Sequence, residues 1–381
     1  MLNIYATLNR NEYEMVLNVP CHDSEIDIAL QNLGETDMCK TKQYCFFIDS
    51  GIPELEVLSN RFIDIDELNY FSKRLDSFDR KELNQFKAAM QVTKPTELLD
   101  MINLTFNLHN YTLISDFSNA AAIGKTHRLN VEGAIPAEIY DSYDYTSLGE
   151  SLLASGNGTL TSYGVLFTNG IEMQEIYDGQ VFPQFFYDNC TLFASIEYSG
   201  KEEILYMPCE DTAIHRAVSR LGADSIEDCS LIEIDSPNLF ISWLSIIHPD
   251  YDCSDIYEMN KLAAVITDFN SEDIEKLMAV SDFAGTSNFE SAAVLAEHLN
   301  SFEFVPNIGS TEELGVYLIR NSGEYSYDEK LEDYYDYDAF GKDTAGIQEG
   351  EFTRNGYVGF KDDLRLGDIL EEDSGLTMGG M

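Results

Sequence analysis

The chain has few basic residues for its length. It contains 23 Lys plus Arg against 68 Asp plus Glu in 381 residues, which gives a formal net charge of −45. Binding to nucleic acid or to an anionic membrane surface requires a cluster of Lys and Arg side chains. The most basic stretch, residues 73–94, also contains Asp76, Asp79 and Glu82. The sequence therefore argues against nucleic acid and against membranes as partners.

The chain also lacks the segments that direct export or membrane insertion. It does not begin with a charged stretch followed by an apolar one, which is the pattern of a secretory leader. It has no apolar run of about 20 residues, the length that a membrane-spanning helix needs. We therefore expect a cytoplasmic protein.

Cysteine is present, but its spacing does not indicate a disulfide or metal framework. The seven cysteines form no Cys-x-x-Cys pair, and the six histidines are scattered. This pattern predicts reduced thiols and no zinc site. Asp336, Asp338 and Asp343 resemble the first ligands of a calcium loop, but Ile347 stands at the twelfth position, where that loop needs Glu. We expect neither a metal nor a cofactor.

The rest of the composition is that of a folded protein. Hydrophobic residues make up 44% of the chain and aromatic residues 12%, whereas disordered acidic chains are poor in both. The charge therefore favours a cationic partner, such as a protein that ordinarily binds DNA. Duplex DNA carries one charge per roughly 1.7 Å, so a charge of this size would match ~75 Å of duplex. That length is comparable with the DNA footprint of a protein.

The second half of the sequence repeats the first. Three pairs of segments match in the same order, at offsets that change by only a few residues. The pairs are 19–23 with 207–211, 65–69 with 256–260, and 143–150 with 335–342. The last pair shares a Tyr-Asp-Tyr motif followed by spaced glycines. The sequence therefore predicts two tandem repeats.

Each repeat divides into three blocks, and the predicted fold class is α+β. We expect a small antiparallel β-sheet and helix domain, a helical middle domain and an α+β end domain in each repeat, which together form an elongated curved body. The first repeat is predicted at 1–170 (blocks 1–60, 61–115 and 116–170) and the second at 188–362 (blocks 188–250, 251–305 and 306–362). Residues 171–187 are predicted as a linker and 363–381 as a disordered tail.

Local patterns predict the elements within these blocks. Apolar runs around Asn9–Asn11 and around Ser199–Lys201 predict a β-hairpin at the start of each repeat. Leu68, Phe71 and Leu75 have helical spacing. The pairs Asp79 with Glu82 and Asn270 with Asp273 are spaced to cap the next helix of each middle block.

These blocks resemble the ArdA family of antirestriction proteins, in particular versions carried by mobile elements of gut Firmicutes. The resemblance rests on the opening NIYATLNRNEYEMVL, on the helical run IDELNYFSKRLDSFDRKELNQFKAAM at 65–90, and on the Tyr-Asp-Tyr motif with its following Gly, Gly, Thr and Gly. It covers both repeats and includes no catalytic signature. Family members are about half as long, consist of three small domains in series and form an elongated dimer.

The resemblance implies a non-enzymatic mimic of bent duplex DNA. Such a protein occupies the DNA groove of type I restriction–modification enzymes. The fusion of two repeats implies either a single-chain pseudo-dimer or a homodimer. The resemblance also implies that residues 135–150 and 327–343 hold the antirestriction motif, which lies near the subunit contact in the family. Residues 1–200 carry 29 acidic and 12 basic residues, against 39 and 11 in 201–381, so the two halves need not have equal roles.

The candidate site is an acidic surface for binding this partner. Carboxylates three or four residues apart on a helix have Cβ atoms about 5–6 Å apart, which is comparable with the phosphate spacing along a DNA strand. The candidates are Asp64, Asp66, Glu67, Glu138, Asp141, Asp144, Glu150, Asp255, Glu258, Glu272, Asp273, Glu324, Asp328, Glu329, Glu332, Asp333, Asp336, Asp338 and Asp343.

Two other interpretations remain open at this point. For any single carboxylate, an ordinary solvated surface is the simpler explanation. The chain could also be an acidic adaptor or inhibitor that binds another basic or DNA-binding defence protein without copying DNA geometry. Paired carboxylates also occur in glycosidases, but so many pairs exist in this chain that they do not indicate a hydrolase.

Overall fold

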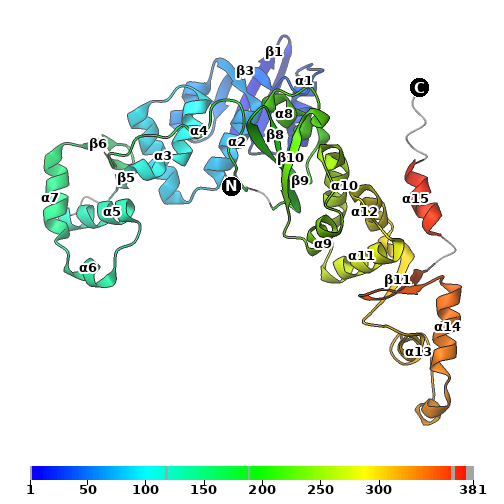
Figure 1. Ribbon diagram of the computed structural model, residues 1–381. Coiled ribbons are helices and arrows are strands. Elements are labelled where there is room, and N and C mark those ends of the chain that lie inside the picture. The colour runs from blue at the N-terminus through cyan, green and yellow to red at the C-terminus, as the bar shows by residue number, and fades with distance from the viewer. Residues whose placement is uncertain (1, 116–118, 188, 362–364, 375–381) are drawn as a thin grey trace. The chain divides into compact units, whose positions relative to one another are not determined.

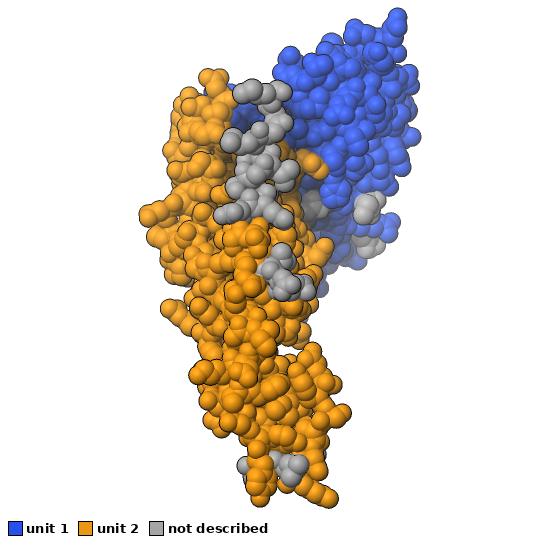
Figure 2. Space-filling model, turned by 90° about the vertical axis from the view of Figure 1, so that its right-hand side faces the viewer, with its two compact units in different colours: residues 1–188, 212–222 blue, residues 189–211, 223–381 orange. Residues whose placement is uncertain are grey.

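The computed structural model describes residues 2–115, 119–187, 189–361 and 365–374, and it confirms the α+β class (Figure 1). Four small antiparallel sheets alternate with helices along the chain. The chain forms two compact units, coloured separately in Figure 2. Unit 1 comprises residues 1–188 and 212–222, and unit 2 comprises 189–211 and 223–381.

The first block of unit 1 is a four-stranded sheet in the order β2-β1-β3-β4. Ile4, Ala6 and Leu8 are fully buried, so β1 has the period-two pattern of a strand with one face on the core. Asn11 has a φ of 57° and makes the turn of the predicted hairpin. The elements are β1 (Ile4–Arg10), β2 (Tyr13–Val19), α1 (Asp23–Asn32), β3 (Lys42–Asp49), the 3-10 helix η1 (Pro53–Leu58) and β4 (Arg61–Asp64).

The middle block of unit 1 is helical, as predicted. Leu68, Phe71 and Leu75 lie on the buried face of the first helix. The predicted capping box of the second helix is also present, since Asp79 accepts the amide N–H of Glu82 at 2.9 Å and the Glu82 carboxylate accepts that of Asp79 at 2.8 Å. The elements are α2 (Ile65–Asp76), α3 (Arg80–Thr93), α4 (Leu98–Phe106) and η2 (Leu108–Asn110).

The end block of the first repeat combines a three-stranded sheet, in the order β5-β7-β6, with three helices. Helices α5 and α7 pack against each other. The elements are β5 (Tyr111–Ile114), α5 (Ala120–Glu132), α6 (Ala137–Ser142), α7 (Tyr145–Ser155), β6 (Gly158–Thr161) and β7 (Gly164–Thr168).

The predicted linker, residues 171–187, packs onto unit 1 without regular secondary structure. The Asn103 side chain on α4 accepts the amide N–H groups of Ile176 and Tyr177 at 2.7 and 2.9 Å and donates to the Tyr177 carbonyl at 2.8 Å. Tyr177 is 1% exposed and donates its hydroxyl to Glu67. These hydrogen bonds replace the water that an extended segment would otherwise bind.

The second repeat follows a similar order of elements, and its first block differs from that of the first repeat after the third strand. Helix α9 occupies the place that η1 and β4 have in unit 1, so the first sheet has only three strands, in the order β10-β8-β9. The elements of the first two blocks are β8 (Leu192–Tyr198), β9 (Lys201–Met207), η3 (Ile226–Asp228), β10 (Ser230–Asp235), α9 (Leu239–Ile247), η4 (Cys253–Asp255), α10 (Ile256–Ile266), α11 (Ser271–Ala284) and α12 (Phe289–Glu297). The predicted capping box of Asn270 and Asp273 is present.

The end block of the second repeat matches that of the first. Its sheet has the order β11-β13-β12, and its helices α13 and α14 pack against each other. The elements are η5 (Leu299–Ser301), β11 (Phe302–Pro306), α13 (Thr311–Arg320), η6 (Glu329–Tyr334), α14 (Tyr337–Ile347), β12 (Glu351–Phe352) and β13 (Gly356–Phe360).

Two predictions about the organisation of the chain need correction. The tail was expected to be disordered from residue 363, but Leu366–Ser374 form helix α15, because Ile369 is an apolar anchor that is only 1% exposed. Residues 362–364 and 375–381 lie outside the described part. Helix α8 (Asp211–Leu221) belongs to the second repeat by sequence, yet its residues 212–222 belong to unit 1. The compact units therefore do not follow the repeat boundary.

Candidate acidic binding surface

A glycine contact between two helices positions the acidic segment of each end block. A Cβ atom at Gly315 on α13 would lie 1.9 Å from the carbonyl oxygen of Tyr337, and one at Gly341 on α14 would lie 1.9 Å from that of Thr311. Gly124 and Gly149 make the same contacts between α5 and α7, at 2.2 and 1.8 Å. Since any side chain would push the helices apart, these glycines fix where the Tyr-Asp-Tyr motif sits.

The aspartate of each Tyr-Asp-Tyr motif caps the helix that follows it. The Asp144 carboxylate accepts the amide N–H of Ser147 at 3.0 Å, and that of Asp336 accepts the amide N–H of Ala339 at 3.0 Å. Hydrogen bonds from the Ser147 hydroxyl and amide lower the pKa of Asp144. Both aspartates remain exposed. The motif therefore starts a helix and still leaves a carboxylate in solvent.

Most candidate carboxylates of the second end block are exposed. Glu324, Asp336 and Asp343 face solvent, and Asp328 is exposed while it caps η6. Asp338 is exposed and accepts a hydrogen bond from the Thr311 hydroxyl. Two further candidates, Glu329 and Asp333, lie in η6, but their side chains are outside the described ones.

The first end block carries a sparser set of exposed carboxylates. Glu138 and Asp141 lie one helical turn apart on α6, and Glu150 lies on α7. All three are exposed, as is Asp144. Residues three apart on a helix have Cβ atoms about 5–6 Å apart. The structure therefore brings four predicted residues of the first repeat onto one short helical segment and the helix after it (α6 and α7 in Figure 1).

The comparisons with known proteins place the second of these two end blocks in a family. Residues 201–359, from β9 to β13, match the family model described as antirestriction protein (ArdA). These residues, called the ArdA region below, are similar to that family. None of the curated proteins compared with the chain matches it.

The first repeat lies outside the matched ArdA region but contains the same local arrangements. Between the first and middle blocks of the first repeat, the Asn69 side chain accepts the amide N–H of Cys21 at 2.9 Å, and in the ArdA region Asn260 does the same for Cys209 at 2.9 Å. The helix pairs of the two end blocks share their glycine contacts. The duplication seen in the sequence therefore extends to the contacts between elements.

The candidates of the middle blocks have mixed surroundings. Asp64 caps α2 and is half-buried, while Glu272 is exposed at the start of α11 in the ArdA region. Three others of the ArdA region are half-buried: Asp255 and Asp273 take part in capping boxes, and Glu258 lies on α10. Asp64, Asp255 and Asp273 therefore take part in helix caps.

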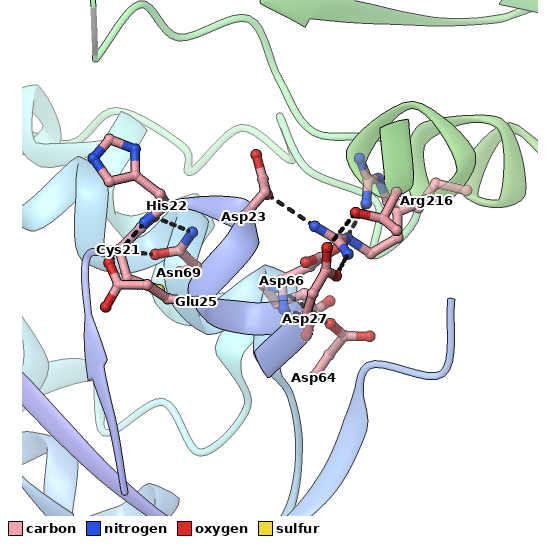
Figure 3. A network of polar contacts seen from close by, with 12 residues as sticks. Cys21, His22, Asp23, Glu25, Asp27, Asp64, Asp66, Asn69 and Arg216 are labelled. Carbon is pink, nitrogen blue, oxygen red and sulfur yellow. Dashed lines mark hydrogen bonds and ion pairs between the residues drawn. The ribbon is translucent and has the colours of Figure 1, made fainter. Parts of the chain in front are cut away.

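Asp66 is buried and was wrongly predicted as part of the acidic surface, whereas Glu67 is half-buried. Asp66 is 9% exposed, and its Oδ2 atom lies 3.1 Å from Arg216 Nε and 2.7 Å from Arg220 Nη1 (Figure 3). Glu67 is half-buried and accepts the Tyr177 hydroxyl at 2.6 Å. Their positions in the first turn of α2 suggested exposure, but the helix α8 and the segment 171–187 cover them.

Arg216 is the centre of an ion-pair network that sequence reasoning missed. Its side chain is 2% exposed and also contacts Asp23 at 3.0 Å and Asp27 at 2.7 Å, both on α1 (Figure 3). Burial alone would lower the pKa of Arg216, but the carboxylates of Asp66, Asp23 and Asp27 raise it, so the guanidinium stays charged. Helical spacing places Arg216 opposite the apolar face formed by Ile214, Ala217 and Leu221, where an exposed arginine is expected, so no local pattern marked it.

The described residues offer little for other chemistry. Among them, no three His, Cys, Asp or Glu side chains are grouped so that they could hold a metal ion. No helix in the described ranges has the length and hydropathy to cross a membrane. All seven cysteines are free thiols, and burial raises the pKa of Cys21 and of Cys253 to about 12. Those two thiols are therefore protonated and poor nucleophiles near neutral pH.

Proposed function

We propose that the protein is a non-enzymatic inhibitor of type I restriction–modification enzymes that acts as a DNA mimic. Its exposed carboxylates occupy sites at which the enzyme ordinarily holds DNA phosphates. The match of residues 201–359 to the antirestriction protein ArdA is the observation that carries this proposal. The net charge of −45 supports it, because a basic DNA groove attracts a polyanion.

The two end blocks are the proposed centre of the binding surface. Their exposed carboxylates lie on α6, α7 and α14 and on the segment before α14, where the glycine contacts hold the helices at fixed separation. A fixed array loses little conformational entropy when it binds. The first repeat is proposed to act as a second ArdA-like unit, because it repeats these contacts outside the matched region.

The test is competition between the protein and DNA for a type I restriction–modification enzyme. The protein is expected to displace labelled duplex DNA and to prevent its cleavage. The apparent affinity should fall as salt rises, because exposed charges are screened over about 8 Å at 0.15 M ionic strength. Equal DNA cleavage with and without an excess of the protein would rule the proposal out.

A pair of charge-matched variants tests whether the array or only the net charge matters. Neutralising Glu324, Asp338 and Asp343 in the end block should weaken displacement strongly. Neutralising an equal number of exposed carboxylates elsewhere in unit 2, namely Glu227, Glu275 and Glu290, should have a much smaller effect. Equal effects of the two triple variants would contradict an ordered array.

A different role is favoured by one surface of unit 2. Leu239 and Ile246 lie two turns apart on one face of α9 and are 73 and 78% exposed, and Ile232 on β10 is 55% exposed. An adaptor that binds another basic defence protein would use such a patch. Changing Leu239 and Ile246 to Ser should leave DNA displacement unchanged under the primary proposal, while loss of displacement would favour the adaptor.

A further inference from the structure

We infer that Arg128 and Arg320 are positioning residues that hold the acidic segments of the two end blocks in place for the partner. The inference rests on the proposed function. The two arginines are 192 residues apart, as are the two Tyr-Asp-Tyr motifs, and each lies on the first helix of its helix pair. The chain has few basic residues, so two arginines at matched positions beside the motif indicate a role for these side chains in the end blocks.

Arg320 connects three parts of the second end block. From α13, its Nε and Nη2 atoms lie 3.2 and 3.1 Å from the Tyr337 hydroxyl, to which they donate. Its guanidinium carbon is 5.1 Å from the centre of the same ring. It also forms an ion pair with Glu332 in η6. One side chain therefore ties α13, the motif tyrosine and the acidic segment before α14 together.

Arg128 has the corresponding position in the first end block. Its guanidinium carbon lies 3.7 Å from the ring centre of Tyr143, the first tyrosine of the motif. One turn earlier on α5, Lys125 Nζ lies 4.2 Å from the ring centre of Tyr140 on α6. All six residues of α6 are described, and none is buried. Cation–π contacts from α5 therefore reach Tyr140 on α6 and Tyr143 directly after it, on either side of the exposed Asp141.

These contacts lead to an expectation opposite to that of charge counting. If only net charge mattered, removing a cation would improve a DNA mimic. If the arginines position the array, removing one lets neighbouring carboxylates move apart under their mutual repulsion. The partner must then order them again on binding, which lowers affinity. Each lost cation–π contact removes an attraction that holds the segment in place, so the change in apparent affinity is measurable.

The experiment compares Arg320→Gln with Lys342→Gln in displacement of duplex DNA from a type I restriction–modification enzyme. Both variants lose one positive charge, and Lys342 is exposed on α14 itself. Arg320→Gln is expected to bind about tenfold more weakly than the unmodified protein. Lys342→Gln should bind equally or more tightly. Arg320→Lys keeps the charge but not the planar contact with Tyr337, so it should lie between.

The outcomes separate this inference from the proposed function. If the unmodified protein displaces DNA and Arg320→Gln behaves like Lys342→Gln, the inference is overturned and the proposed function stands. If the unmodified protein does not displace DNA, the proposed function fails first. Hydrogen exchange adds a structural readout: faster exchange confined to residues 321–336 supports positioning, whereas faster exchange throughout α13 and α14 overturns it.

A variant in the other repeat gives an independent measurement. Arg128→Gln leaves the second end block unchanged and is expected to weaken displacement several-fold, with faster exchange in α6 but not in α5 or α7. Unchanged displacement by Arg128→Gln would overturn the inference for the first repeat.

Discussion

Replacing Arg216 should destabilise unit 1 more than replacing Arg220, the other arginine that pairs with Asp66. The Arg216 side chain is 2% exposed, and the side chains of its partners Asp27 and Asp66 are 15 and 10% exposed, so the charges lie largely out of water. Arg216→Met would leave buried carboxylates without their cation. Removing one partner of a buried ion pair typically costs about 3–5 kcal/mol.

Two features set the expected size within that range. Asp23 is 31% exposed, so water compensates part of its lost ion pair. Burial raises the pKa of Asp66, and the loss of Arg216 removes one of the two guanidiniums that oppose this shift, so Asp66 can take up a proton and limit the cost. We therefore expect a loss of about 3 kcal/mol near neutral pH.

The assay is native-state hydrogen exchange of α8, because a protein with two compact units need not unfold in one transition. In the unmodified protein, the amides of α8 should be protected from exchange about as well as those of α1 and α2, because Arg216 on α8 forms ion pairs with aspartates on both of these helices. In Arg216→Met, the protection of α8 should fall by the expected free energy. The control is Arg80→Met, which replaces an exposed arginine of α3 and should change the protection of α8 little.

Two further variants test the electrostatic explanation. Arg220→Met should cost less, since the Arg220 side chain is 22% exposed, against 2% for Arg216. Adding Asp66→Asn to Arg216→Met should recover part of the lost protection, because the uncompensated carboxylate is gone. A change below about 1 kcal/mol in Arg216→Met, or strict additivity with Asp66→Asn, would refute the reasoning.

Two other predictions follow from the end blocks. Gly315→Ala or Gly341→Ala should separate α13 from α14, because the added Cβ would lie 1.9 Å from a carbonyl oxygen of the facing helix. Gly346→Ala is the control and should be tolerated, because Gly346 has open space around it. Far-UV circular dichroism and proteolysis of the end block measure the effect, and near-native behaviour of both Gly315→Ala and Gly341→Ala would contradict the close contact. Hydrogen bonds lower the folded-state pKa of Asp144 below 3.8, so its contribution to the start of α7 is complete above pH 3.8 and is lost as the pH falls through the lowered pKa. The amide resonance of Ser147 should therefore titrate with a midpoint below 3.8, and Asp144→Asn should abolish that titration. A midpoint at or above 3.8 would show that the cap is not formed in solution.

Much of the fold could be predicted from local sequence patterns. Alternating apolar residues in β1, the helical spacing in α2 and the capping boxes at Asp79 and Asn270 depend on neighbours a few residues away, so the sequence contains the information needed. The duplication and the resemblance to ArdA were visible for the same reason: each rests on residue types at fixed spacing. The family model described as antirestriction protein (ArdA) matches residues 201–359, which lie within the second repeat.

The site was predictable in composition but not residue by residue. The sequence alone determined the sign and size of the charge, the two Tyr-Asp-Tyr motifs and the blocks that contain them. Only the tertiary structure decided which carboxylates remain free, because that depends on segments distant in sequence. Asp66 and Arg216 are 150 residues apart, and no local pattern predicts that a helix from the second repeat brings a buried guanidinium to three aspartates of the first.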